Sequence, residues 1–230
     1  MTRRADGRTG RRAVTLAAVV LSVSPSGRPP VRQDPWPVLD RASAAYDSIA
    51  TLSADFVQIV QNPLLGGPDT TRGTLHLRRP ARFAMRFTDP AGDRIVADGR
   101  HLWLYTPSTT PGQVVRSAIP AAGTTGPNLI AQFVERPRER YEARYVRPDS
   151  LASGWADVVA LVPKDTTLPY EEAVIWVDRS DGLVRRIEIA ETTGAGQQRV
   201  VILRRVRVNA AVPAREFVFR PPAGVRVVDL

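Results

Sequence analysis

The side chains of this chain that could perform acid–base or metal chemistry are few and poorly placed for it. There is no cysteine, and the only histidines, His76 and His101, lie inside expected strands without the spacing of a metal-ligand pair. The segment Asp178–Asp181 is too short for a calcium loop and has the composition of a hairpin turn. Glu171 and Glu172 are neighbours on an expected strand, so they face opposite sides and cannot act as a pair. The sequence therefore predicts no catalytic residue, no metal site and no cofactor, and it indicates a binding protein.

The pattern that surrounds the histidines is that of short, half-buried strands separated by turns. Apolar residues recur with a period of two between residues 73 and 105, which is typical of strands with one buried face. These alternating positions are Leu75 and Leu77, then Phe83, Met85 and Phe87, then Leu102 and Leu104. Pro80 interrupts the first run, because proline cannot donate a hydrogen bond to a sheet ladder.

The rest of the chain extends this pattern into a mainly β fold. Residues 36–50 have the three- and four-residue spacing of an amphipathic helix. Strands are expected at about residues 52–61, 70–78, 82–88, 94–98, 101–105, 113–117, 140–147, 155–163, 170–177, 183–190, 198–208 and 217–219. This arrangement predicts a half-open antiparallel β-barrel of about 11 strands. The strand pattern itself leaves open whether the barrel contains an apolar cavity or a filled core.

The strand pattern is broken in the middle of the chain. Residues 118–127 are small, uncharged and rich in Gly and Pro, and residues 128–135 suit a short helix with Asn128 as its N-cap. Two interpretations remain open, a lid over the cavity and an ordinary connection across the sheet.

Three ordered motifs give the chain a resemblance to a known family. The first covers the basic-Pro strand and the following Asp-Gly strand; the second is an "F-x-Q" strand after the first helix; the third is an "F-x-F-x-P-P-x-G-V" segment near the end. Their positions are Gly73, Leu75, Leu77, Arg78, Arg79, Pro80, Phe83, Asp98, Gly99, Leu102, Trp103 and Tyr105; Phe56 and Gln58; and Phe217 to Val225. In this order they resemble the outer-membrane lipoprotein carrier family, LolA.

The resemblance implies a site that binds acyl chains beneath a helical lid. Arg79 matches the family's functional arginine, which contacts the lid, and Phe83 matches an apolar position near the cavity mouth. The other expected lining or lid residues are Met85, Phe87, Phe56, Leu102, Trp103, Ile130 and Phe133. For Arg79, a strand-end arginine in solvent is the alternative, and for the apolar residues it is a filled core.

The first residues have the composition of a targeting segment. Five arginines precede an apolar run from Ala13 to Val23, which is long enough for a signal peptide and too short to span a bilayer. The expected organisation is a signal peptide at 1–26, a Pro-rich linker at 27–35 and a single carrier-like domain at 36–230. The sequence leaves open whether the chain is exported by the general secretory (Sec) pathway or by the twin-arginine (Tat) pathway. Because no cysteine follows the apolar run, a lipid anchor there is excluded, and the cleaved chain is expected to be soluble and periplasmic.

The formal net charge of +9 falls to +5 without residues 1–26, which carry five Arg and one Asp. The remaining arginines alternate with apolar residues along strands, so the sequence does not indicate nucleic-acid binding. Attraction to anionic lipid headgroups is a secondary possibility.

The resemblance implies a monomeric carrier of lipoproteins from the inner to the outer membrane. Its implied partners are lipoprotein acyl chains and an inner-membrane ABC lipoprotein-releasing transporter, and an outer-membrane lipoprotein receptor is left open. The main alternative is a general carrier or sensor of other lipids or hydrophobic ligands on the same fold. A lipid-modifying enzyme is disfavoured, because the sequence offers no catalytic constellation.

Overall fold

The computed structural model describes residues 33–64, 66–119, 129–192 and 196–230. The expected signal peptide, most of the linker, Asn128 and most of the segment 118–127 lie outside these residues. The helices are α1 (Trp36–Asp47), α2 (Leu129–Val134), α3 (Pro137–Arg140) and the short 3-10 helix η1 (Ala214–Phe217). The strands are β1 (Thr51–Gln61), β2 (Asp69–Arg78), β3 (Arg82–Asp89), β4 (Ala91–Asp98), β5 (His101–Tyr105), β6 (Gln113–Ala118), β7 (Tyr141–Leu151), β8 (Gly154–Pro163), β9 (Tyr170–Asp178), β10 (Val184–Glu191), β11 (Gln198–Val208) and β12 (Arg226–Asp229).

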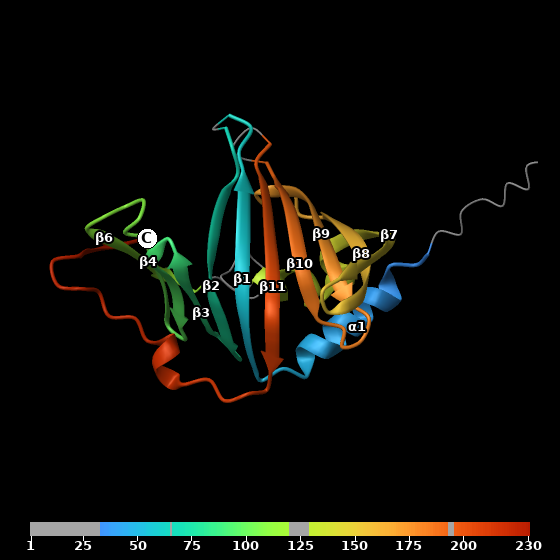
Figure 1. The fold of residues 1–230 in the computed structure, drawn as a ribbon, viewed down its shortest axis with the longest axis horizontal. Helices are drawn as coiled ribbons and strands as arrows, with labels where there is room; N and C mark the ends of the chain where they lie inside the picture. The colour runs from blue at the N-terminus through green and yellow to red at the C-terminus, as the bar shows by residue number, and fades with distance from the viewer. Residues whose placement is uncertain (1–32, 65, 120–128, 193–195) are drawn as a thin grey trace, which may run out of the picture. The chain divides into compact units, whose positions relative to one another are not determined.

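All twelve strands belong to one open, curled sheet, as the sequence predicts within one strand. Their order is β12-β6-β5-β4-β3-β2-β1-β11-β10-β9-β8-β7, so the chain's first and eleventh strands meet in the middle of the sheet. Figure 1 shows β1 and β11 side by side, with β2–β6 on one side, β7–β10 on the other, and α1 near the β7–β9 end. Neighbouring strands are antiparallel except β12, which pairs with β6 in parallel. The mainly β, half-open fold is confirmed.

The two faces of the sheet differ in what covers them. We call the face that packs with α1 and α2 the inner face; its core includes Leu39, Phe56 and Phe133, none of which is more than 1% exposed. The opposite, outer face carries a smaller cluster of Ala84, Val96, Trp103 and Val114 beneath the C-terminal residues Val212, Phe217 and Phe219. The helices thus cover one face and the end of the chain covers part of the other.

Two expected elements differ from the structure: the first helix and the last expected strand. The first helix ends at Asp47, three residues before the expected end. A strand at 217–219 is wrong: Phe217 is the last residue of η1, Phe219 lies just after it, and both pack on the outer face. The last strand is β12. The alternation of Phe217 and Phe219 resembles a strand, but their apolar side chains are buried by tertiary packing instead of by strand pairing.

A glycine in β2 shapes the inner face where the first three strands meet. A Cβ atom on Gly73 would lie 2.1 Å from the carbonyl oxygen of Arg86 and 2.8 Å from the ring of Phe56. Without it, the rings of Phe56 and Phe87 meet edge to face with centroids 5.1 Å apart. Glycine at this position therefore allows two large aromatic side chains to share one place on the inner face.

None of the helices in the described ranges is long and apolar enough to cross a membrane. Those same ranges contain no group of three or more His, Asp or Glu residues placed to hold a metal ion.

Candidate functional site: the inner face of the sheet

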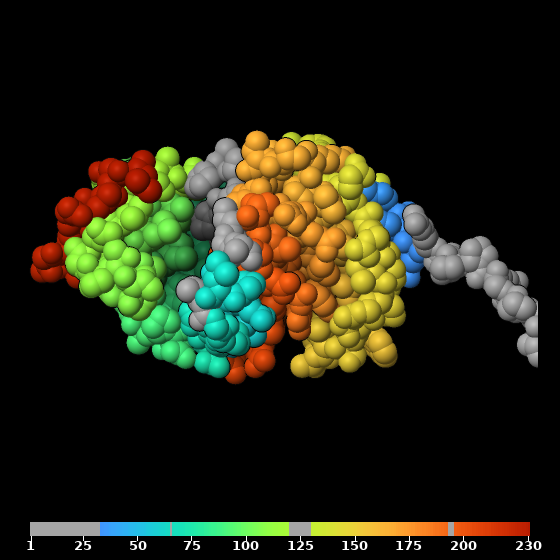
Figure 2. Space-filling view, turned by 90° about the horizontal axis from the view of Figure 1, so that it is seen from above, coloured from blue at the N-terminus to red at the C-terminus, as the bar shows by residue number. Residues whose placement is uncertain are grey.

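The inner face carries an apolar surface that is only partly covered on strands β3–β5. Register pairs Phe83 with Ala97 and Met85 with Ile95, and Ala97 with Leu102, so these side chains lie on one face as the alternation predicts. Phe83 is buried, whereas Met85, Phe87 and Leu102 are half-buried and pack against the edge of the inner core. We call Met85, Phe87 and Leu102 the half-buried stripe. Figure 2 shows that the molecule is hollowed between the cyan β1–β2 hairpin and the green strands.

Helix α2 places apolar side chains over the inner face. Phe133 is fully buried and Ile130 is 7% exposed, and both belong to the same core as Phe56 and Phe83. The Phe133 ring lies 6.1 Å from the ring of Tyr141 and 6.0 Å from that of Tyr170. The short helix and the sheet therefore pack together here as a filled apolar layer. Seven predicted site residues are brought into one cluster, the four above and the stripe residues Met85, Phe87 and Leu102 at its edge.

The end of α2 is held by hydrogen bonds to its last carbonyl groups. The Tyr141 hydroxyl donates to the carbonyl oxygen of Gln132 at 2.9 Å and lies 2.8 Å from the Tyr170 hydroxyl. Burial, followed by the hydrogen bond with Tyr170, raises the pKa of Tyr141, so this hydroxyl keeps its proton and remains a donor. The Ser43 hydroxyl of α1 donates to the carbonyl oxygen of Val134 at 2.6 Å. These bonds satisfy carbonyl groups that a helix end leaves without partners.

Arg79 lies in the turn between β2 and β3 and reaches both helices. Its guanidinium carbon sits 4.4 Å from the centroid of the Tyr46 ring of α1. Its Nη2 atom is 3.5 Å from Asp47 Oδ1 and 3.8 Å from Oε1 of Glu135, the residue directly after α2. One side chain, 31% exposed, thus connects the sheet with the ends of α1 and α2.

Arg78 and Trp103 lie on the other face. Arg78 donates to the carbonyl oxygen of Val212, and its guanidinium carbon lies 5.2 Å from the centroid of the Phe217 ring. Trp103 donates from its indole nitrogen to Asp98 at 2.8 Å and packs 5.5 Å from the Phe219 ring. Trp103 therefore belongs to the outer-face cluster, although its neighbour Leu102 is on the inner face, because adjacent side chains in a strand alternate.

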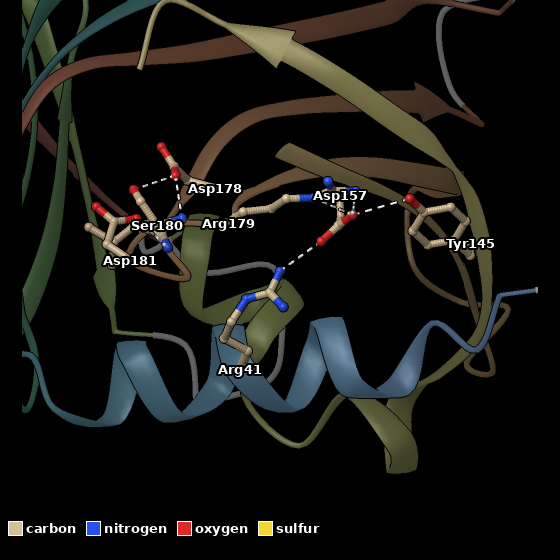
Figure 3. A network of polar contacts seen from close by, with 8 residues as sticks. Arg41, Tyr145, Asp157, Asp178, Arg179, Ser180 and Asp181 are labelled. Atoms are coloured by element: carbon tan, nitrogen blue, oxygen red, sulfur yellow. Dashed lines mark hydrogen bonds and ion pairs between the residues drawn. The ribbon is translucent and has the colours of Figure 1, made fainter. Parts of the chain in front are cut away.

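The sequence did not reveal a buried ion network that fixes α1 to the sheet (Figure 3). Asp157 of β8 accepts hydrogen bonds from Arg41 of α1 at 2.9 Å, from Arg179 at 2.6 and 3.0 Å, and from the Tyr145 hydroxyl at 3.1 Å. Its side chain is 6% exposed. Burial would raise the pKa of Asp157, but the hydrogen bonds from Arg179, Arg41 and Tyr145 outweigh it and hold the pKa below its usual value. The available signal was a single carboxylate inside the apolar run of β8, since such a residue needs partners when buried.

A second carboxylate orders the turn next to this network. Asp178 Oδ1 accepts from the backbone nitrogen and the hydroxyl of Ser180, at 2.9 and 2.7 Å, and Oδ2 pairs with Arg185 at 3.2 Å. Burial opposes ionisation, but the hydrogen bonds from Ser180 and Arg185 lower the pKa of Asp178 to about 2. The turn residues predicted between β9 and β10 do shape a turn, and α1 lies directly against it: a Cβ on Gly182 would come within 3.1 Å of Ala45 and of the Arg41 carbonyl oxygen.

An open curled sheet with short helices packed on its apolar inner face defines the fold class of this chain. Comparison with known sequences places this chain more closely. The family model "Outer membrane lipoprotein carrier protein LolA" matches residues 47–220, which include β1 to β11 and η1. The chain belongs to this family.

Individual relatives agree with the family assignment. An outer-membrane lipoprotein carrier protein of Chromobacterium violaceum is 33% identical over 180 residues, covering 78% of this chain and 81% of the relative. One of Albidiferax ferrireducens is 30% identical over 187 residues, covering 79% and 85%. Among solved structures, an uncharacterized conserved protein from Thermus thermophilus shares the fold with a TM-score of 0.54 at 14% identity, covering 86% of this chain and all of that one.

Proposed function

We propose that this protein is a carrier that binds the acyl chains of lipoproteins on the inner face and moves them from the inner to the outer membrane. Membership of the LolA family and the names of the relatives support the lipoprotein as cargo. The structural observation that supports the proposal is the half-buried stripe at the edge of the inner core, a partly covered apolar surface on β3 and β5. This role requires no chemical step by the protein.

The energetics favour displacement of α2 by an acyl chain. Burying roughly 15 CH₂ groups would gain about 12 kcal/mol, at about 0.8 kcal/mol for each group. Exposing Ile130 and Phe133 would cost about 3–6 kcal/mol, at about 1.5–3 kcal/mol for each side chain. The cargo therefore has enough binding free energy to open the lid. In this proposal the structure corresponds to the closed, unloaded state, with α2 occupying the acyl site.

Arg79 is proposed as the latch of this lid. Its contacts reach α1 and the residue after α2, so opening α2 removes the Glu135 contact. Both ion pairs are long and partly exposed, and such pairs contribute about 0–1 kcal/mol each. A weak latch suits a carrier, because acyl binding can break it and its re-formation favours release.

The proposed setting is the periplasm. The family name and the basic, apolar start of the chain support export with removal of a signal peptide near residue 26 and release of a single-domain monomer. An inner-membrane ABC transporter would supply the lipoprotein, and an outer-membrane receptor is the proposed acceptor.

Binding of an environment-sensitive acyl probe tests the acyl site. We expect saturable binding that a synthetic lipopeptide competes away, and Met85→Asp should reduce it strongly because a carboxylate would be buried beside the acyl chain. Thr88→Asp is the matched control, since Thr88 is exposed at the end of β3. Absence of saturable binding would contradict the acyl site. Competition by free fatty acids as strong as by the lipopeptide would favour the general lipid carrier.

A two-step transfer assay tests the latch. Cargo-loaded Arg79→Leu should accept lipoprotein but release it to an acceptor more slowly than the wild type. Arg78→Leu is the control, because Arg78 contacts Val212 and Phe217 on the outer face. Equal release by wild type and Arg79→Leu, or an equal defect in the control, would contradict the latch role.

A further inference from the structure

A β-bulge in β11 gathers arginines on the outer face. The register between β1 and β11 shifts between Ser53 and Asp55, and Arg205 has a left-handed φ of 49°. In a regular strand, residues three apart project from opposite faces, so Arg204 and Arg207 would be separated. The extra residue of the bulge puts Arg204 and Arg207 on the same face. Val206 packs against the inner core, and both arginines line hollows of the outer face. A non-glycine residue at positive φ is unfavourable, which indicates that the arrangement has a use.

These arginines line a groove across the middle of the sheet. A hollow of about 640 Å³ extends from the tip of the β7–β8 hairpin, residues 150–153, to Val206, and a second of about 360 Å³ continues from Arg205 to His76 of β2. The two share Arg205 and Val206 in their walls. The hairpin tip bounds the groove on one side, and beyond β2 the C-terminal residues 212–219 cover the sheet on the other. The groove is therefore an open part of the outer face between the hairpin tip and the C-terminal residues.

The groove is basic, because its lining, among the described residues, contains five arginines and a single carboxylate, that of Asp55. Arg205 pairs with Asp55, but within the described ranges no carboxylate lies within 4.0 Å of the side chain of Arg204 or Arg207. Both residues are exposed, and the side chain of Arg205 is 84% exposed. The floor includes Ser53, whose hydroxyl lies 2.9 Å from Nδ1 of His76. Guanidinium groups beside hydroxyl donors are suited to phosphate oxygens.

The composition of the groove favours a membrane surface over a protein partner. Protein interfaces are anchored by large apolar or aromatic side chains that become buried at their centre. The groove does contain apolar side chains, but Leu151, Ile202 and Val206 are half-buried, and none of the described residues that line it is a Phe, Tyr or Trp. Exposed arginines beside such a surface, without an aromatic anchor, are typical of peripheral attraction to anionic lipid.

We propose that the groove gathered around Arg204, Arg205 and Arg207 docks the protein, outer face first, on the phosphate headgroups of an anionic phospholipid bilayer. The inner face and its lid then point away from the docked surface and remain separate from it. This contact goes beyond acyl binding, because it uses other residues on the opposite face of the sheet.

Co-sedimentation with vesicles tests the docking surface. Vesicles of phosphatidylglycerol and phosphatidylcholine are compared with phosphatidylcholine alone, at low and high salt, and mass spectrometry defines the N-terminus so that the N-terminal arginines are equal in all variants. Each arginine near an anionic surface contributes a factor of about five, so Arg204→Gln with Arg207→Gln should weaken binding about 25-fold. The control, Arg100→Gln with Arg144→Gln, removes the same charge from exposed residues outside the groove.

Three outcomes would overturn the proposal. They are equal binding to both kinds of vesicle, an equal loss in the control, and wild-type vesicle binding by the groove variant. If that last result came with a defect in transfer to an acceptor, the groove would be a protein-docking site. Acyl-probe binding is measured alongside: its loss with intact vesicle binding would contradict the proposed carrier function alone.

Discussion

The sheet has two halves, β7–β10 and β2–β6, on either side of the central strands β1 and β11. Both halves show the same alternation of apolar side chains, but these side chains are covered to different extents. On β8–β10 the inner-face residues Val159, Ile175 and Ile187 are fully buried beneath the helical side of the core. On β3 and β5 the equivalent residues of the half-buried stripe pack only against the edge of that core.

What differs is the cover: Asp157 fixes α1 to the β7–β10 half, and Phe133 of α2 also packs on this half, against Tyr141 of β7 and Tyr170 of β9. The stripe on β3 and β5 has only the edge of the core beside it. One sheet can therefore provide both a stable core and an apolar surface that a ligand can use.

The largest test of this comparison is a pair of truncations, one in each half. Ile175→Ala should lower the free energy of unfolding by about 2–5 kcal/mol, because a fully buried side chain leaves a cavity. Leu102→Ala should cost less, about 1–2 kcal/mol, since Leu102 is partly exposed to solvent and its truncation leaves no closed cavity. Urea unfolding of the two variants measures the difference. Equal losses would mean that both halves are closed cores.

A polar residue in α2 offers a second test, with an effect in the opposite direction. Gln132 is 4% exposed, and its Oε1 atom has no hydrogen-bond partner in the structure that the described residues form. An unsatisfied buried acceptor costs about 1–3 kcal/mol, so Gln132→Leu should stabilise the protein by about 1–2 kcal/mol.

If α2 must move to admit an acyl chain, the same substitution should weaken acyl-probe binding by up to roughly tenfold, which corresponds to about 1.4 kcal/mol. Thermal unfolding and probe titration are measured on one preparation. Greater stability with unchanged affinity would show that α2 stays in place when the ligand binds, and would extend the stable core to the second half.

The smallest expected effect concerns the ion network under α1. Asp157→Asn should cost about 1 kcal/mol at pH 7, a modest value because Arg41 and Arg179 are 37% and 45% exposed and can turn to water. Because the pKa of Asp157 is lowered in the folded state, its contribution is complete above its ordinary value of 3.8 and is lost as pH falls through the folded pKa.

The stability difference between wild type and Asp157→Asn should thus be constant from pH 7 to about 5 and shrink as pH falls below about 4. Urea unfolding at several pH values measures it. A difference that grows on acidification would mean that the carboxylate is not stabilised by its partners. Glu172→Gln is the control, because it removes one carboxylate from a more exposed ion pair. Glu172 lies 3.6 Å from Arg144, and their side chains are 39% and 64% exposed.

Local pattern predicted most of the fold and part of the site. Period-two alternation placed Phe83, Met85 and Leu102 on one face, and the structure confirms that register. The same alternation puts the neighbours Leu102 and Trp103 on opposite faces. Assigning both to one site was therefore inconsistent with the pattern, and Trp103 lies in the outer-face cluster. Phe217 and Phe219 show where the rule fails. Apolar residues two positions apart suggest a strand, but these two are buried because the segment packs on the sheet without pairing with it.

The sequence by itself determined most of the strands, the first helix, the turns and the family, because each depends on residues close together in the chain or on ordered motifs. Only the tertiary structure decided that Arg41 and Arg179 meet Asp157, that Arg79 joins α1 to the end of α2, and that a bulge brings Arg207 beside His76 on the same face as Arg204. These contacts join residues up to 131 positions apart, as His76 and Arg207 are, and their partners are chosen by the order and curl of the strands. Side-chain types set what each group can bind, but the path of the sheet sets which groups are close enough to do so.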